Sequence, residues 1–387
     1  MTSNHLLKAL SNQATPCYYY DMDVLNQSLE HVQKHGIQKG YHVHFALKAN
    51  HEPKILKHIQ QAGLGADCVS GGEVQQALDY GFSPSQIAFA GVGKTDEEMM
   101  LGLKNDIFCF NVESYQELVV LNKLAQKMGK KARVALRLNP NVVVNTHKYI
   151  TTGLHENKFG INDDELVEVL AYLPQAEAIE FLGIHFHIGS QITDLAPFEQ
   201  LCKKCNDYVR FIESQGFQVR VLNMGGGYGV NYDAPDEAPY PDFKSFFEVF
   251  DHHLMVRDDQ EVHFELGRSI IAQAGSLLTK VLYIKERQVK NFAVVDAGMT
   301  ELIRPALYQA RHHIDKLSVV ESPKTIKKYD VVGPICESSD TFREDIELEE
   351  LERGDVLAIR SAGAYGQVMK SRYNLRPDHP TLYSDEL

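Results

Sequence analysis

The sequence predicts an α/β protein made of a (β/α)8 barrel and a second, mostly antiparallel β domain. Two observations predict the barrel: eight short apolar runs of β-like composition follow one another, and helical patterns separate them. Strands that alternate with helices form parallel sheets, and eight such units can close into a barrel. A third observation predicts the β domain, because β-like runs after about residue 270 have little helix between them.

The barrel strands are expected where the eight apolar runs lie. These are HVHFALK from residue 42, ADCVS from 66, IAFAG from 87, IFCFNV from 107, RVALRLN from 133, FLGIHFHIG from 181, VRVLNMGGG from 219 and EVHFELGR from 261. An open, doubly wound sheet would show the same alternation, so the strand count leaves both sheets possible. We expect the barrel at residues 25–270 and the β domain at 1–24 and 271–387, with CYYYDMDVL supplying a strand of the β domain.

Composition excludes several classes of protein. The 387 residues carry a net charge of −13, which argues against a nucleic-acid partner, and 44% of them are hydrophobic, which is ordinary for a protein with a large core. No apolar stretch approaches the length of a membrane span, and the first residues lack the apolar segment of a secretion signal, so we expect a cytoplasmic protein with no membrane partner. The six cysteines are scattered, and CKKC at Cys202–Cys205 lies in a helical pattern, so we expect neither a disulfide framework nor a metal site.

Residues that can do chemistry follow four of the eight runs. In barrels of this kind the active site lies at the carboxyl ends of the strands. A buried lysine ammonium is costly unless it is paired or used, so Lys48 either reaches solvent or serves a site. The residues are Lys48 after the first run, His185, His187 and Ser190 after the sixth, Gly225, Gly226, Gly227 and Gly229 after the seventh, and Glu265 and Arg268 at the eighth.

Together these residue types predict pyridoxal 5'-phosphate (PLP). The aldehyde of this cofactor takes a lysine amine as a Schiff base, and glycine backbone N–H groups can hold its phosphate. His187 can stack on the pyridine ring, and Glu265 can keep the ring nitrogen protonated. Each residue also has a purely structural interpretation, such as a surface lysine, a tight turn or an ion pair between Glu265 and Arg268. Their joint occurrence at strand ends favours the cofactor.

Nearly the whole chain resembles the fold-type III PLP-dependent decarboxylases, which have an alanine-racemase-like barrel, and within them the branch that acts on meso-2,6-diaminopimelate. The matching segments are FALKAN, VSGGE, TTGLHENKFGI, GIHFHIGSQ, NMGGGYG, ELGRSI, DAGMTELIRPALY, VVGPICESSDTF and GAYG, in this order. The resemblance implies decarboxylation of meso-diaminopimelate to L-lysine and CO2, the last step of lysine biosynthesis. It also implies a head-to-tail homodimer whose active sites are shared between the subunits.

The resemblance assigns roles to the matching residues. Lys48 and Cys336 would be catalytic, the first as the Schiff-base amine and the second as the proton donor. Cys336 and Glu337 would come from the partner subunit. The cofactor-binding residues would be Lys48, His187, Ser190, Gly226, Gly227, Glu265, Gly267, Arg268 and Tyr365. The substrate-binding residues would be Arg268, Arg304, Tyr308, Glu337 and Tyr365.

Two positions carry separate expectations. The family usually has proline where this chain has Leu266, and we expect a small change in loop geometry there, because proline fixes φ and lacks an N–H donor. His312 and His313 follow a helix-like segment, and we expect both at the surface.

Three alternatives to this function remain. A related decarboxylase could act on arginine, ornithine or carboxynorspermidine, but ornithine has no distal carboxylate for Arg304 to hold. A racemase gains from a weaker electron sink, and Glu265 argues against it. A non-enzymatic homologue would be expected to lack Lys48 or the glycine-rich turn, and both are present.

Overall fold

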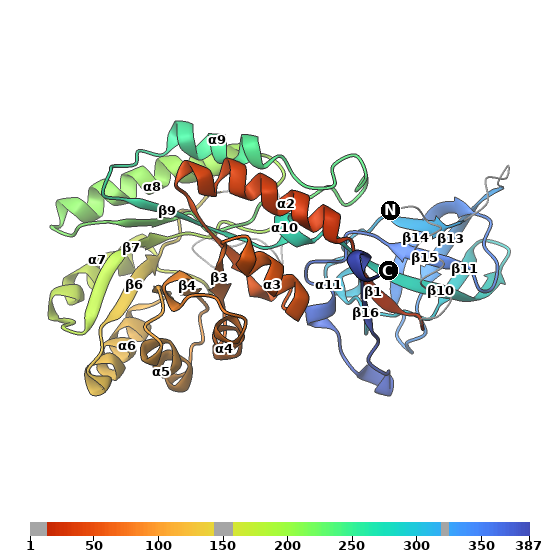
Figure 1. The fold of residues 1–387 in the computed structure, drawn as a ribbon, viewed down its shortest axis with the longest axis horizontal. Coiled ribbons are helices and arrows are strands. Elements are labelled where there is room, and N and C mark those ends of the chain that lie inside the picture. Colours follow the sequence, from red (N-terminus) through yellow and green to blue (C-terminus); the bar gives the residue numbers. More distant parts are fainter. Residues whose placement is uncertain (1–13, 143–157, 319–324) are drawn as a thin grey trace. The chain divides into compact units, whose positions relative to one another are not determined.

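A computed structural model describes residues 14–142, 158–318 and 325–387. The chain divides into two units (Figure 1). The barrel unit comprises the described residues of Leu29–Gly229 and Asp242–Gly267, and the β unit comprises those of Met1–Ser28, Val230–Pro241 and Arg268–Leu387. The segment Val230–Pro241 belongs to the β unit, although barrel residues precede and follow it in the sequence. The expected division, with boundaries after residues 24 and 270, assigned this segment to the barrel.

Eight parallel strands close into a barrel in the described part of the chain, which confirms the (β/α)8 prediction and rules out the open sheet. Each strand pairs with the next along the chain, and the last strand pairs with the first, Phe45 lying opposite Leu266. The strands are β2 (His42–Ala46), β3 (Gly65–Cys68), β4 (Ile87–Phe89), β5 (Cys109–Val112), β6 (Ala132–Arg137), β7 (Ile179–His185), β8 (Val221–Asn223) and β9 (Glu261–Leu266).

Helices connect the barrel strands and cover their outer side (Figure 1). Ser70 caps one of them by accepting a hydrogen bond from the Glu73 N–H, as its position before an apolar run indicates. Cys202 and Cys205 are buried within another, which confirms a plain helix for CKKC. The helices are α2 (Met22–His35), α3 (Pro53–Gln61), α4 (Gly71–Asp79), α5 (Asp96–Lys104), α6 (Tyr115–Met128), α7 (Asp163–Tyr172), α8 (Ala196–Ser214) and α9 (Phe243–His253).

An aromatic cluster holds α8 and α9 against β9. Phe198 of α8 packs edge-to-face on Phe246 of α9, and Phe250 of α9 packs in the same way on Phe264 of β9, with ring centroids 5.1 and 4.7 Å apart. Edge-to-face aromatic pairs stabilise by about 0.5–1.5 kcal/mol beyond the area that they bury. The cluster fixes the strand that carries Glu265.

The β unit is a mixed, mostly antiparallel sheet, as predicted, and β1 (Cys17–Tyr20) joins it as the expected N-terminal strand. The long strand β10 (Gly275–Glu286) pairs antiparallel with β1, β11 and β15, whereas the pairs β1–β16 and β11–β13 are parallel. The remaining elements of this unit are α10 (Arg268–Ile271), β11 (Asn291–Val295), α11 (Arg304–Tyr308), β12 (Ile314–Leu317), β13 (Ile326–Val332), β14 (Thr341–Glu349), β15 (Val356–Ile359) and β16 (Thr381–Tyr383). None of the helices in the described ranges is both long and apolar enough to cross a bilayer.

Candidate active site

Lys48 is the second residue after the end of β2, in a short 3-10 turn at Leu47–Ala49. Its Nζ is 2.8 Å from Oδ2 of Asp67 on the neighbouring strand β3. The Asp67 side chain is fully buried, whereas the Lys48 side chain is 33% exposed. Burial and the nearby Glu265 raise the pKa of Asp67 to about 7, against the opposing effect of Lys48. The amine is therefore held at the barrel end by a buried acid but stays open to a ligand.

A second barrel lysine, Lys94, is more deeply buried but is already saturated with partners. Its side chain is 1% exposed, and its Nζ donates to Gly91 O, Asn111 O and Glu117 Oε1 at 2.7–2.9 Å. An ammonium has three N–H groups, so these bonds occupy all of them. Lys94 therefore has a structural role, and Lys48 is the better candidate for an amine that reacts.

Glu265 accepts hydrogen bonds from side chains of three other strands. Asn111 of β5 and Asn223 of β8 donate to Oε1 at 2.9 and 2.8 Å, and His185 Nε2 at the end of β7 lies 2.9 Å from Oε2. Burial alone would raise the pKa of Glu265, but His185, Lys48 and Asn223 together lower it. The carboxylate is thus ionised at neutral pH, and Oε2 keeps a lone pair for a further donor.

His187 follows β7 and lies beside the same barrel end. Burial, followed by the charges of Arg137 and Lys48, lowers its pKa well below the usual value, so the imidazole is neutral. Ser190 lies three residues further on and is partly buried. A neutral, half-buried ring suits stacking on a flat ligand.

The glycine-rich turn after β8 is closely packed and also offers two N–H groups. A Cβ on Gly225 or Gly226 would come within 2.0 Å of Phe186 O or 1.9 Å of Glu265 O, so packing against β7 and β9 requires glycine at both positions. The N–H groups of Gly225 and Gly229 donate to Asn223 Oδ1 and Ile192 O. Within the described part of the chain, those of Gly226 and Gly227 have no acceptor. The turn can therefore donate two backbone hydrogen bonds to an anion.

Gly267, directly after β9, lets this strand end approach the turn that carries Lys48. A Cβ there would lie 2.9 Å from Ala49 Cβ and 3.1 Å from Ala46 Cβ. Leu266, where the family usually has proline, is the buried last residue of β9 and stays in the ladder opposite Phe45. Leucine therefore continues the strand at this position.

In the β unit, Arg268 and Arg304 gather around Tyr232. Arg268 Nη1 lies 2.6 Å from the Tyr232 hydroxyl, and its guanidinium carbon is 4.8 Å from the centre of the Tyr365 ring. The Arg304 guanidinium carbon lies 4.7 Å from the centre of the Tyr232 ring. Burial would raise the pKa of Tyr232, but the two arginines lower it. Two largely buried cations beside neutral rings favour the binding of an anion.

His312 contacts Arg304 in the interior of the β unit, so the expectation that His312 lies at the surface is wrong. It is completely buried, its Nδ1 is 2.7 Å from Arg360 O, and its Nε2 is 2.9 Å from Arg304 Nη1. Because the Arg360 carbonyl can only accept, Nδ1 carries the proton and Nε2 accepts from the guanidinium. The helix-like pattern before it concealed this role, since His312 already lies in the irregular segment after α11.

The loop between β13 and β14 carries Cys336 and Glu337. Cys336 is the exposed cysteine, whereas the other five are buried. Glu337 Oε1 accepts a hydrogen bond of 2.6 Å from the Tyr373 hydroxyl. Asp340 holds the loop through two hydrogen bonds. Its buried carboxylate accepts from the Ile335 N–H at 2.7 Å, and its backbone N–H donates to Glu337 O.

Sequence reasoning singled out the candidate residues of the site but missed most of their hydrogen-bond partners. Asp67, Asn111 and Asn223 each stand in a short, otherwise apolar strand, where a buried polar side chain needs a hydrogen bond. That contrast is the signal that could have found them. Tyr308 ends α11 and is partly buried. Residues 151–157 of the family-like segment TTGLHENKFGI lie outside the described residues.

The fold and the site together are those of a PLP-binding enzyme. The closed (β/α)8 barrel carries a paired lysine, an ionised buried carboxylate, a neutral histidine and donor glycines at its strand ends. The family described as pyridoxal-dependent decarboxylase, pyridoxal-binding domain, matches residues 23–272. The two findings agree on the cofactor, and the family description adds decarboxylation as the type of reaction.

Full-length relatives narrow the assignment. A diaminopimelate decarboxylase of Bacteroides thetaiotaomicron is 50% identical over 374 residues, which is 96% of each chain, and one of Aquifex aeolicus is 42% identical over 94% of this chain and 85% of its own. The crystal structure of diaminopimelate decarboxylase from Helicobacter pylori complexed with L-lysine superposes with a TM-score of 0.92 at 39% identity, covering 99% of this chain and 94% of that one. The chain belongs to the diaminopimelate decarboxylases within the pyridoxal-dependent decarboxylase family.

Proposed function

We propose that the chain decarboxylates meso-2,6-diaminopimelate to L-lysine and CO2, the last step of lysine biosynthesis, with PLP as its cofactor. The observation that carries the proposal is the ionised Glu265 in the same barrel end as Lys48. An anionic partner on the pyridine nitrogen makes PLP a strong electron sink, which a decarboxylase needs and a racemase avoids.

The barrel residues fit the cofactor. Lys48 would bind its aldehyde carbon, His187 would stack on its ring, and Glu265 would hold the proton of the pyridine nitrogen. Gly226 and Gly227 offer donors for the phosphate, and Ser190, Gly267, Arg268 and Tyr365 would complete its binding. When bound, PLP accepts the electron pair that the departing carboxylate leaves behind.

The arginine cluster accounts for the choice of substrate. Meso-diaminopimelate has a carboxylate at each end, so one reacts while the distal one must be held. Arginine binds a carboxylate through two parallel N–H donors, and Arg304 is kept in place by His312. Arg268, Tyr308 and Tyr365 would contact the rest of the substrate.

Proton delivery after CO2 loss is proposed for Cys336. A thiol carries a transferable proton, and this one is exposed on its loop while Glu337 beside it offers a carboxylate to the distal ammonium of the substrate. We further propose a homodimer in which these two residues serve the active site of the partner subunit. The cytoplasmic location stays a prediction from the sequence.

Turnover of separate substrates tests the proposal. The purified protein, saturated with PLP, is offered meso-diaminopimelate, L-ornithine and L-arginine in turn, and CO2 and the amine product are measured. We expect L-lysine from diaminopimelate alone, and no product from Lys48→Ala. Turnover of ornithine or arginine would keep the fold and the cofactor but contradict the role given to Arg304.

A further inference from the structure

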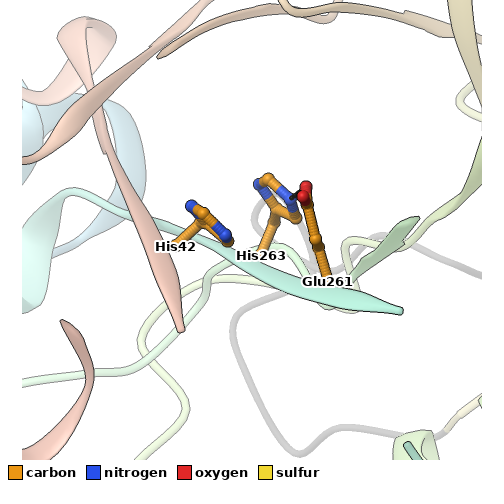
Figure 2. A group of neighbouring side chains, drawn as sticks. All are labelled: His42, Glu261 and His263. Carbon is orange, nitrogen blue, oxygen red and sulfur yellow. Dashed lines mark hydrogen bonds and ion pairs between the residues drawn. The ribbon is translucent and has the colours of Figure 1, made fainter. Parts of the chain in front are cut away.

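A second cluster of possible ligands lies at the end of the barrel strands opposite to Lys48. His42 is the first residue of β2, and Glu261 and His263 are the first and third residues of β9 (Figure 2). The strands β2 and β9 are the first and last of the barrel, and their pairing closes it. His42 lies directly opposite His263 in this pairing, so side chains far apart in the chain meet at the seam.

The three side chains are near enough to one another to share a metal ion. One ligand atom from each lies within 4.8 Å of those of the other two. The two imidazole rings stack with centroids 4.5 Å apart, and His263 Nε2 is 3.3 Å from Glu261 Oε2. His263 is buried, whereas His42 and Glu261 are exposed. The cluster therefore has one fixed ligand and two that can turn toward an ion arriving from solvent.

The hydrogen bonds around His263 leave room for a cation in this cluster. His44 Nδ1 lies 3.0 Å from Gln86 O, which can only accept, so Nδ1 carries a proton. His44 is buried, so its neutral form is favoured, and its Nε2 then accepts from His263 Nδ1 at 2.9 Å. A neutral His263 consequently points the lone pair of Nε2 at the Glu261 carboxylate. Two acceptors that face each other need a proton or a metal cation between them.

The same chain of bonds is the usual support of a metal-binding histidine. Such a histidine donates its second ring N–H to a neighbouring acceptor, which fixes its tautomer and orientation. His263 Nδ1 does this toward His44, and His44 is in turn fixed by Gln86 O. The Phe108 ring stacks on His263 with centroids 4.6 Å apart and holds the ring plane.

We propose that His42, Glu261 and His263 bind a divalent cation of the Zn²⁺ type, which clamps β2 to β9. Two imidazoles and one carboxylate form a ligand set that suits Zn²⁺, with water in the remaining position, whereas Mg²⁺ and Ca²⁺ prefer oxygen ligands. Ligand-to-metal distances of about 2.0–2.2 Å require the cluster to contract and the His42 ring to turn out of its stack on His263. The two exposed side chains, His42 and Glu261, can make these movements. Sequence reasoning expected no metal site, because it examined local spacing and these ligands come from opposite ends of the barrel sequence.

The clamp acts on stability rather than on the reaction. The strand β2 leads to Lys48 and β9 contains Glu265, so a cation at their other ends would secure the seam that carries both residues. A ligand that binds only the folded protein raises its melting temperature by mass action. We therefore expect Zn²⁺ to raise the melting temperature of the protein. His42, Glu261 and His263 take no part in the catalytic chemistry.

Zinc titration of ligand variants tests the site. The PLP-loaded protein carries Cys336→Ser, which removes the exposed thiol as a competing ligand, and is freed of metal with a chelator. Binding of ZnCl₂ is then measured by calorimetry, and bound zinc by elemental analysis, for this background and for the added variants His42→Asn and Glu261→Gln. The matched control is His31→Asn, which removes one of two histidines whose rings lie 5.6 Å apart on α2 and could bind zinc adventitiously.

The proposal expects one equivalent of zinc in the background and in His31→Asn. Affinity should fall roughly tenfold or more in His42→Asn and Glu261→Gln, as for the loss of other groups that fix a metal. The zinc-dependent rise in melting temperature should disappear with it. Far-ultraviolet circular dichroism and the visible absorbance of bound PLP show that the variants are folded. Zinc binding that is absent from the background, or equally strong in both ligand variants, would overturn the proposal and leave a shared proton between His263 and Glu261.

Discussion

At the scale of single residues, Glu265 is the point where the buried polar groups of the barrel converge. Donors from β5, β7 and β8 fix the carboxylate before any ligand arrives, so its charge and direction do not depend on the substrate. A hydrogen bond to a charged group is worth about 1.5–3 kcal/mol. His185 supplies one of these bonds and is therefore a positioning residue for the proposed cofactor contact.

The first prediction concerns His185. Replacing it with leucine removes the donor to Glu265 Oε2, so we expect PLP to bind about 10- to 100-fold more weakly, in line with the loss of one charge-assisted bond. Equilibrium titration followed by visible absorbance measures this change. His185→Gln, which can place an amide donor near the same oxygen, should recover part of the affinity. Equal losses in both variants would contradict a specific role for the donor.

At the scale of elements, two short supports hold the proposed substrate-contacting residues of the β unit. Asp340 fixes the turn that presents Cys336 and Glu337, because it accepts N–H bonds of Ile335 and Met299 at 2.7 and 2.6 Å. His312 holds Arg304 at the start of α11. Neither support was predicted from the sequence, since each bonds to groups that only the tertiary fold brings near.

The second prediction concerns Asp340. In Asp340→Ala the buried N–H of Ile335 and the partly buried N–H of Met299 lose their acceptor, so we expect the loop to loosen and kcat to fall at least tenfold. Steady-state decarboxylation measures kcat, while the visible absorbance of bound PLP should remain because the barrel is untouched. Asp345→Ala on the nearby strand β14 is the control with an exposed carboxylate. A variant with normal kcat would show that the turn needs no such anchor.

The third prediction concerns Arg304 and its support. His312→Leu removes the acceptor for Arg304 Nη1, so we expect KM for diaminopimelate to rise about tenfold, the effect of roughly 1.4 kcal/mol. His312→Gln offers an amide oxygen in its place and should show a smaller rise. Substrate saturation curves separate KM from kcat. A fall in kcat with an unchanged KM would contradict the positioning role.

At the scale of the whole molecule, the alternation of strand and helix sets the architecture, and the sequence pattern was sufficient to predict it. All eight barrel strands occur in the predicted runs, because buried parallel strands need continuous apolar sequence. Lys48, His187 and Glu265 were predicted because strand ends are marked in the sequence. His185 was among the predicted strand-end residues, and Asn111 and Asn223 stand out as polar residues in apolar strands. Their bonds to Glu265, like the pairing of His42 with His263, could not be derived, since they depend on which strands become neighbours.

The fourth prediction is a loss of stability in acid. Burial, and then the charge of Arg304, lower the pKa of His312 from 6.5 to about 3, so the folded protein binds fewer protons than the unfolded chain between these values. The contribution of His312 to the free energy of unfolding is complete above pH 6.5 and is lost as the pH falls toward 3, on the order of 5 kcal/mol over the whole window. Melting temperatures between pH 7.5 and 5 should fall less steeply in His312→Gln. Parallel curves for the two proteins would contradict this assignment.

The most direct test of the account identifies the lysine that holds the cofactor. The PLP-saturated protein is reduced with borohydride, which fixes the pyridoxyl group to its amine, and the labelled peptide is identified by mass spectrometry. We predict one label, on Lys48, because its amine faces Asp67 and is partly open, whereas Lys94 uses all three of its N–H groups. Label on Lys94 or another lysine, or no label at all, would contradict the proposed active site.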